Sequence, residues 1–255
     1  MATQLLGDTT AGRPTPAPVR KARRVWSSNP AVVLWGTMVG KKVVMAVTGL
    51  VLVGFVIGHM LGNLKIFSGA GVIDAYAGFL RTVGEPLFPY SLLLWIVRIV
   101  LILSVGLHIT AAFQLTRMNW AARPHEYETK KSLVTTWAAR IMRWSGVILA
   151  VFIVFHLMHL TAGWVGFEPG GFHHLAVYQN VVAAFSVWPV SLFYILAMAC
   201  LYLHLDHGVW SMFQTLGWNN AKTTWGLQAL SRGLALMLFV GFISVPVAVL
   251  AGWLR

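Results

Sequence analysis

Four histidines lie deep inside long apolar stretches of this 255-residue sequence, at positions 59, 108, 156 and 204. The hydrocarbon core of a bilayer disfavours ionisable side chains, so a histidine placed there indicates a functional site. Imidazole is a common ligand of transition metals, and it also carries protons. These four side chains are therefore the first candidates for the chemistry of the protein.

Two of the histidines close a repeated pattern. Residues 48–63 read TGLVLVGFVIGHMLGN, and residues 145–160 read SGVILAVFIVFHLMHL. Each stretch opens with a small hydroxyl residue and a glycine, followed by nine apolar residues and a histidine, which is His59 or His156. The alignment makes His156, and not His159, the counterpart of His59.

The elements that must position these histidines are membrane-spanning helices. Hydrophobic residues make up 58% of the chain and charged residues only 10%, a composition unlike that of soluble domains. A helix needs about 20 mostly apolar residues to cross a bilayer, and five segments reach this length. The sequence therefore predicts an all-α integral membrane domain over residues 31–255, with spans near 43–63, 91–116, 144–166, 187–208 and 233–254. Residues 1–30 are predicted to form a mobile tail.

Charge predicts how the spans are oriented. Basic residues concentrate before the first span, between the second and third, and between the fourth and fifth, whereas the opposite loops hold only Lys65 and Arg81. Because basic loops stay in the cytoplasm, we expect the N-terminus inside and the C-terminus outside. The net charge of +12 then reflects topology and lipid head groups rather than nucleic-acid binding.

This topology sorts the four histidines by depth, since a helix rises about 1.5 Å per residue. His59 and His156, which we call the outer pair, lie farther from the cytoplasmic face than His108 and His204, which we call the inner pair. Two histidines at one depth on facing helices suit the two axial positions of a haem iron. The prediction is a five-helix bundle that encloses two b-type haems. With both axial positions filled, each haem would transfer electrons rather than bind dioxygen.

Glycines on the first and third spans, namely Gly49, Gly54, Gly58 and Gly146, are predicted to give a porphyrin room against the helices. Close packing between helices is the alternative role of such residues.

A different metal site is suggested by two H-x-x-H pairs, His156 with His159 and His204 with His207, which resemble the histidine boxes of membrane di-iron enzymes. The two pairs would lie in opposite halves of the membrane, and no carboxylate accompanies the first, so this alternative is disfavoured. The remaining histidines fall in predicted loops and are expected to be solvated; they are His125, His173 and His174.

Several function classes find no support in the sequence. Its one cysteine, Cys200, cannot provide an iron–sulfur centre, and there is neither a glycine-rich phosphate loop nor a G-x-S-x-G motif. Hydrolytic chemistry is therefore not expected.

Residues 40–255 resemble the cytochrome b membrane-anchor subunit of succinate dehydrogenases and fumarate reductases, in its five-helix, di-haem class. The resemblance lies in the two repeated stretches and in HLDHGVWSMFQTLG, which begins at His204. In that segment, His204 is followed four residues later by Gly208 and then by Trp210. This spacing is similar to the family's fourth-helix ligand pattern, and the similarity selects His204 over His207. His108, in LHITAAF, falls where the second-helix ligand is expected.

The resemblance implies that the outer pair holds a distal haem and the inner pair a proximal haem. It also implies a flavoprotein with FAD and an iron–sulfur subunit docked on the cytoplasmic face of a bacterial cell membrane. Succinate would be oxidised on the flavoprotein, and this chain of respiratory complex II would relay the electrons to a quinone, commonly menaquinone. It leaves room for a higher oligomer of the complex.

Other interpretations stay open at this point. Some fumarate-reducing members carry a glutamate two residues before the fourth-helix ligand, where this sequence has Tyr202. That difference favours succinate dehydrogenase, with fumarate reductase as the alternative. A haemless proton-coupled transporter, with the histidines as relays, and a haemless structural anchor are the remaining alternatives.

Further polar residues are predicted to serve the haems and the quinone. Arg98 is expected to face the propionates of the distal haem, or else to extend outward past Tyr90. Beyond the outer pair, His159 and Asn63 are predicted to bind the quinone or to transfer protons. A second, inner quinone site is predicted near Trp144, Ser145 and Asp206.

Overall fold

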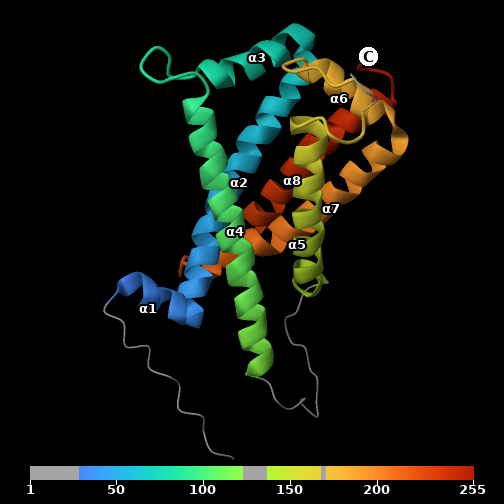
Figure 1. Cartoon of the computed structure of the whole chain (residues 1–255). Coiled ribbons are helices and arrows are strands. Elements are labelled where there is room, and N and C mark those ends of the chain that lie inside the picture. Colours follow the sequence, from blue (N-terminus) through green and yellow to red (C-terminus); the bar gives the residue numbers. More distant parts are fainter. Residues whose placement is uncertain (1–28, 123–136, 168–170) are drawn as a thin grey trace, which may run out of the picture.

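The computed structural model describes residues 29–122, 137–167 and 171–255, and this part of the chain is helical without a strand (Figure 1). The α-helices are α1 (Pro30–Gly36), α2 (Met38–Asn63), α3 (Ala70–Thr82), α4 (Leu92–Ala121), α5 (Trp137–His156), α6 (Val177–Ser186), α7 (Trp188–Thr215) and α8 (Thr224–Leu250). A 3₁₀-helical segment, η1 (Leu64–Ser68), extends α2, and a π-helical segment, η2 (Leu157–Thr161), extends α5. The predicted tail lies almost entirely outside the described residues.

Five of these helices are long and apolar enough to cross a membrane, namely α2, α4, α5, α7 and α8. Large apolar side chains along them face away from the protein: Ile102 is 66% exposed and Phe113 62% exposed. Such surfaces are stable against lipid but not against water. The prediction of an all-helical, multi-pass membrane protein with five spans is confirmed.

The helices are longer than the predicted spans at the end of the bundle that carries the basic residues, which we call the basic end. There α2 begins at Met38 instead of 43, α4 ends at Ala121 instead of 116, and α7 ends at Thr215 instead of 208. Likewise, α5 begins at Trp137 and α8 at Thr224, several residues before the predicted bounds. Apolar content sets a predicted span, whereas a helix continues as long as its backbone hydrogen bonds form.

At the opposite end, which we call the far end, two helices stop earlier than predicted. The third span ends with η2 at Thr161, not at 166, and α8 ends at Leu250, not at 254. Gly163, Gly166 and Gly252 follow these helices with positive φ angles of 66°, 80° and 73°. This left-handed backbone is easy for glycine and terminates a right-handed helix.

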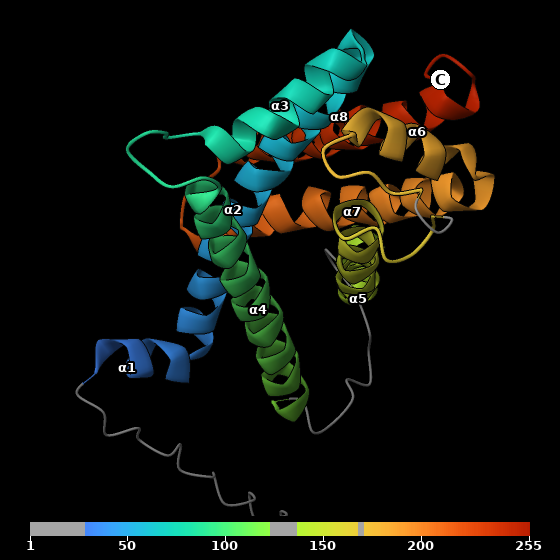
Figure 2. The same ribbon diagram turned by 45° about the horizontal axis from the view of Figure 1, so that its top comes forward.

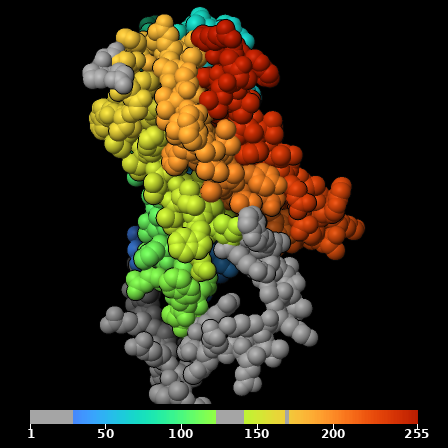
Figure 3. Space-filling model, turned by 90° about the vertical axis from the view of Figure 1, so that its right-hand side faces the viewer, coloured from blue at the N-terminus to red at the C-terminus, as the bar shows by residue number. Residues whose placement is uncertain are grey.

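The spans form two contacting pairs, α2 with α4 and α5 with α7. Helices α2 and α4 run in opposite directions (Figure 1), whereas α5 crosses α7 steeply and is seen nearly end-on in Figure 2. Helix α8 packs along α7 and also contacts α2. On the face shown in Figure 3, α7 lies between α5 and α8. The first helix of each pair, α2 or α5, carries one copy of the repeated stretch. The repeat in the sequence therefore corresponds to a repeated pair of helices.

Three short helices occupy segments for which the sequence analysis predicts no structure. Helix α1 lies at the basic end, where the buried Lys41 donates a hydrogen bond to the Trp35 carbonyl. Helices α3 and α6 contact each other at the far end (Figure 1). There the Asp74 carboxylate accepts a 3.0 Å hydrogen bond from the Tyr178 backbone N–H in the first turn of α6, where helix N–H groups have no partner of their own.

Candidate functional site: two histidine pairs

The four histidines of the apolar stretches meet as two pairs in the middle of the bundle. The ring centres of His59 and His156 lie 5.9 Å apart, with an angle of 76° between the ring planes. The ring centres of His108 and His204 lie 6.3 Å apart, at 54°. Each pair joins one helix from α2/α4 to one from α5/α7, and the partners are those predicted from depth.

The ring separations can be compared with those of two imidazoles on one metal. A metal–imidazole bond is about 2.0 Å long, and the ligating nitrogen lies about 1.2 Å from the ring centre, so two axial rings have centres about 6.4 Å apart. Both observed separations are within half an ångström of this value. The ring separations of both pairs thus match that of two imidazoles on one metal ion.

Each inner histidine is held by the hydroxyl residue and the backbone of the span it packs against. His108 Nδ1 lies 3.1 Å from the Met45 carbonyl oxygen and 3.3 Å from Thr48 Oγ1. Because a carbonyl only accepts, Nδ1 carries the hydrogen, and the lone pair for a metal is on Nε2. Such a hydrogen bond from the second ring nitrogen is typical of metal-binding histidines.

The other inner histidine repeats this arrangement one helical pair later. His204 Nδ1 lies 3.4 Å from Ser145 Oγ, and the Met142 backbone also interacts with the ring. Ser145 is fully buried, and its hydroxyl also donates to the Met142 carbonyl at 3.0 Å. Met142 precedes Ser145 by three residues, as Met45 precedes Thr48. The hydroxyl residue that opens each repeat thus serves the histidine on the partner helix, a role that the sequence analysis missed.

The glycine after each hydroxyl residue makes room for the same imidazole. A Cβ atom at Gly49 would lie 3.4 Å from His108 Cε1, and one at Gly146 would lie 3.5 Å from His204 Cε1. These two glycines therefore lie against a ring of the inner pair, and their predicted role beside a porphyrin stays a prediction. At Gly54 and Gly58 a Cβ would meet no atom within 4 Å, and their predicted role stays a prediction.

The outer histidines stack on phenylalanines that also follow the repeat. Phe55 stacks on His59 with ring centres 5.3 Å apart, and Phe152 stacks on His156 at 5.8 Å. Each phenylalanine precedes its histidine by four residues, about one helical turn. A ring of α8, Phe242, also approaches His59, at 6.0 Å.

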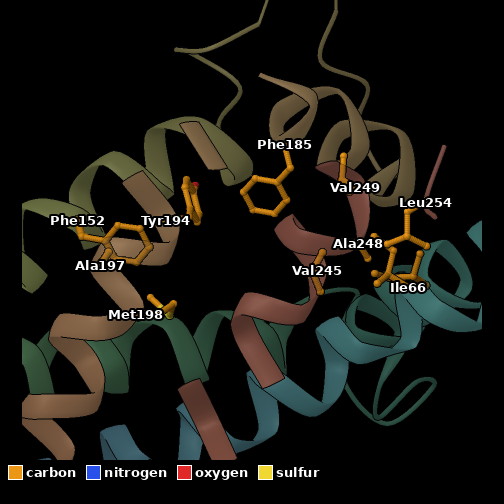
Figure 4. Close-up of a cluster of buried hydrophobic side chains, with 11 residues drawn as sticks. Ile66, Phe152, Phe185, Tyr194, Ala197, Met198, Val245, Ala248, Val249 and Leu254 are labelled. Atoms are coloured by element: carbon orange, nitrogen blue, oxygen red, sulfur yellow. The ribbon is translucent and has the colours of Figure 1, made fainter. Parts of the chain in front are cut away.

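Tyr194 on α7 connects His156 with His159. Its hydroxyl oxygen lies 3.3 Å from His156 Nδ1 and 3.0 Å from His159 Nδ1. The Tyr194 side chain is 6% exposed and packs against Phe185 (Figure 4), with ring centres 4.9 Å apart. The sequence analysis missed this residue, and its only signal was a polar tip within the apolar fourth span.

The other residues predicted at the outer pair lie in different surroundings. His159 is fully buried in η2, whereas Asn63 is the half-buried last residue of α2. The Arg98 guanidinium lies 4.8 Å from the centre of the Trp95 ring, one turn nearer the far end. This cation–π contact directs the Arg98 charge toward the far end. That is the direction expected if Arg98 extends outward past Tyr90, the alternative to a propionate contact. Its predicted contact with a propionate stays a prediction.

The residues predicted for an inner quinone site lie in different surroundings. Ser145 is buried against His204, whereas Trp144 is 70% exposed. Asp206 faces Arg232 of α8, with 3.7 Å between Oδ1 and Nε. The structure thus gives Ser145 a role at the inner histidine pair, and the predicted inner quinone site stays a prediction.

Cationic side chains gather at the basic end of α2 and α4. Lys41, Gln114 and Arg117 line one hollow there, together with Met118 and Ala121. Lys41 is one turn from Met45, whose carbonyl meets the inner His108. These cations could hold the acidic groups of a cofactor bound at the inner pair, and the sequence analysis used them only for topology.

The described residues contain no group of three or more His, Cys, Asp or Glu side chains arranged for one metal ion. Two protein ligands per site suit a haem iron, because the porphyrin supplies the other four. The two H-x-x-H pairs form no such group among these residues. His173 and His174 are exposed as predicted, and His125 lies outside the described residues.

Comparison with known proteins adds no relative: no protein-family profile, curated protein or solved structure matches the chain. The functional proposal therefore rests on the residues and their geometry.

Proposed function

We propose that this chain is the di-haem cytochrome b membrane-anchor subunit of a succinate:quinone oxidoreductase. The outer pair would ligate the distal haem and the inner pair the proximal haem. The observation that carries the proposal is the separation of the rings, 5.9 and 6.3 Å, which suits one metal between the rings of each pair. The enzyme class comes from the resemblance of the repeated stretches and of the segment that begins at His204.

The two sites are stacked along the bundle at the same interval in both repeats. Gly49 contacts the His108 ring and Gly146 the His204 ring, so these glycines mark the level of the inner pair. His59 and His156 each follow their glycine by ten residues, a rise of about 15 Å. When bound, the two haems would carry single electrons along this axis between a reduced partner and a quinone.

The protein's own groups orient the ligands and exclude water. Backbone and hydroxyl groups keep the Nδ1 hydrogen of the inner imidazoles on the side away from the metal. At the outer pair Tyr194 performs this task for His156. With both histidines of a pair as its ligands, a haem at either site would have no open coordination position for dioxygen.

The basic end of the bundle is the proposed docking face for the flavoprotein, which carries FAD, and the iron–sulfur subunit. It holds Lys41, Lys42 and Arg117, and basic ends of membrane proteins face the cytoplasm. The far end would then face outward across a bacterial cell membrane. We propose that a quinone, menaquinone in this class, reacts there beside the outer pair.

A reduced-minus-oxidised spectrum of the purified full chain, with haem quantification, tests the proposal. Two low-spin b haems per chain are expected after dithionite reduction. A chain without haem would overturn the proposal and leave the histidines to a transporter or a structural anchor. Co-purification with a flavoprotein and an iron–sulfur protein, together with succinate-dependent quinone reduction, tests the assigned enzyme. Comparing that rate with quinol-dependent fumarate reduction separates it from the fumarate reductase alternative.

A further inference from the structure

His159 carries a buried polar atom that the two proposed haem sites leave unused. Its side chain is fully buried, and its Nε2 has no hydrogen-bond partner among the described residues. It lies in η2, and π-helical turns recur at functional sites. A buried polar atom left unpaired in a folded protein calls for an explanation, and a ligand that pairs with it is one.

The surroundings of this atom are aromatic and close to a loop. The Phe155 and Phe167 rings both lie 5.2 Å from the His159 ring, measured between centres. A Cβ at Gly166 would lie 2.7 Å from His159 Nε2, so only glycine lets the backbone approach this closely. Apolar walls with one well-placed polar group are typical of sites for small aromatic ligands. Gly166 and Phe167 cover Nε2, so they are the residues that must move to admit a ligand.

The hydrogen-bond network determines which His159 nitrogen carries the hydrogen. Tyr194 has one O–H, so it can donate to only one of the two Nδ1 atoms and must accept from the other. If His156 binds iron through Nε2, its Nδ1 carries the hydrogen and donates to the Tyr194 oxygen. The Tyr194 hydroxyl then donates to His159 Nδ1, and neutral His159 carries its hydrogen on Nε2.

We propose that Tyr194 is a positioning residue that sets both tautomers, and that His159 thereby offers its Nε2–H to a carbonyl oxygen of a quinone. The inference rests on the proposed function, because it takes His156 as a haem ligand.

The Tyr194 link is tested by redox titration of the haems in the purified full chain. Tyr194→Phe keeps the ring and removes the acceptor of the His156 hydrogen bond. That bond makes the imidazole a stronger donor and favours ferric iron, so its loss should raise the midpoint potential of the distal haem. We expect a change in the reduction equilibrium of up to about tenfold, or about 59 mV for one electron. The proximal haem and Tyr202→Phe, on the same helix, are the controls, and neither should shift.

The His159 donor is tested by binding 2-methyl-1,4-naphthoquinone to the same preparation. A hydrogen bond from Nε2–H should lower the infrared stretching frequency of one quinone carbonyl in the wild-type chain. His159→Phe should abolish this shift and weaken binding at least tenfold, whereas His159→Gln, which keeps an N–H donor, should retain most of both. Tyr194→Phe should weaken the shift without removing haem, because the tautomer is no longer held.

The outcomes separate this inference from the proposed function. Two haems, with the distal potential unchanged in Tyr194→Phe and the carbonyl shift unchanged in His159→Phe, would overturn the inference and leave the di-haem proposal standing. A wild-type chain without haem would overturn the proposed function and the Tyr194–His156 link with it. In that chain, a carbonyl shift lost in His159→Phe would still establish His159 as the quinone donor.

Discussion

The inner histidines His108 and His204 are held by the same kind of hydrogen bond to a hydroxyl group. The hydrogen bond that holds the outer His156 has no counterpart at its partner, His59. At the inner pair, each Nδ1 faces a hydroxyl from the opening of a repeat, on the helix next to its own. At the outer pair, His156 shares the Tyr194 hydroxyl with His159. His59 stacks on Phe55 and has a tilted ring, Phe242, 6.0 Å away.

The difference indicates a division of tasks between the two sites. A symmetric, buried support suits a site that only holds a haem, because it fixes both imidazoles in the same way. An asymmetric support that continues to another buried histidine suits a site that communicates with a substrate.

Removing one axial histidine should remove one haem. Alanine at His59 or His156 should abolish the distal haem, because one histidine cannot fill both axial positions, and alanine at His108 or His204 should abolish the proximal one. Haem per chain should fall from two to one, measured from the reduced spectrum. His159→Ala is the matched control and should keep both haems. Loss of a haem in that control, together with retention in His156→Ala, would contradict the repeat alignment.

Enlarging the glycines of the repeats should affect the inner pair alone. Valine at Gly49 or Gly146 places branched methyl groups against a ring that a bare Cβ already approaches to 3.4 or 3.5 Å. The imidazole must then move, and we expect loss of the proximal haem with the distal haem retained. Alanine at the same positions should be tolerated, since those distances are ordinary contacts. Equal loss of both haems would mean that the glycines serve helix packing in general.

Removing the hydroxyl groups should weaken the inner site without abolishing it. In the double variant Thr48→Val with Ser145→Ala, backbone contacts to both rings remain, so we expect about a tenfold loss of proximal haem affinity. Haem transfer to apomyoglobin measures this loss. Thr110→Val is the control, because the Thr110 hydroxyl bonds the Gly106 carbonyl of its own helix. An unchanged proximal haem in the double variant would show that the hydroxyls are incidental.

The contact between α3 and α6 should affect stability more than haem binding. Asp74→Ala removes the acceptor for the Tyr178 N–H, and losing such a cap costs about 1 kcal/mol of unfolding free energy. A slightly lower midpoint of thermal unfolding is expected, with both haems present. The exposed Glu85 provides the control Glu85→Ala. Selective loss of the distal haem in Asp74→Ala would show that the far-end helices support the outer pair directly.

The number of spans could be predicted because bilayer thickness fixes the length of an apolar helix. The ends of the helices could not, since Met38 and Thr215 lie beyond the apolar windows and yet continue the backbone hydrogen bonds. The histidine pairs could be predicted from depth because the rise of a helix is constant. The role of Tyr194 could not be predicted, because nothing in the sequence around a tyrosine in an apolar span indicates which side chain its hydroxyl contacts.

Three features could be derived from the order of the residues alone. They are the five spans, their alternating direction, and the repeat that places one histidine of the outer pair on each of two similar stretches. These features depend on local properties, namely hydropathy, helical rise and the order of residues. Only the tertiary structure decided that Thr48 and Ser145 serve the histidines of neighbouring helices, and that Tyr194 joins His156 to His159. Such contacts depend on how helices rotate and pack against one another. That packing is set jointly by residues that are far apart in the sequence.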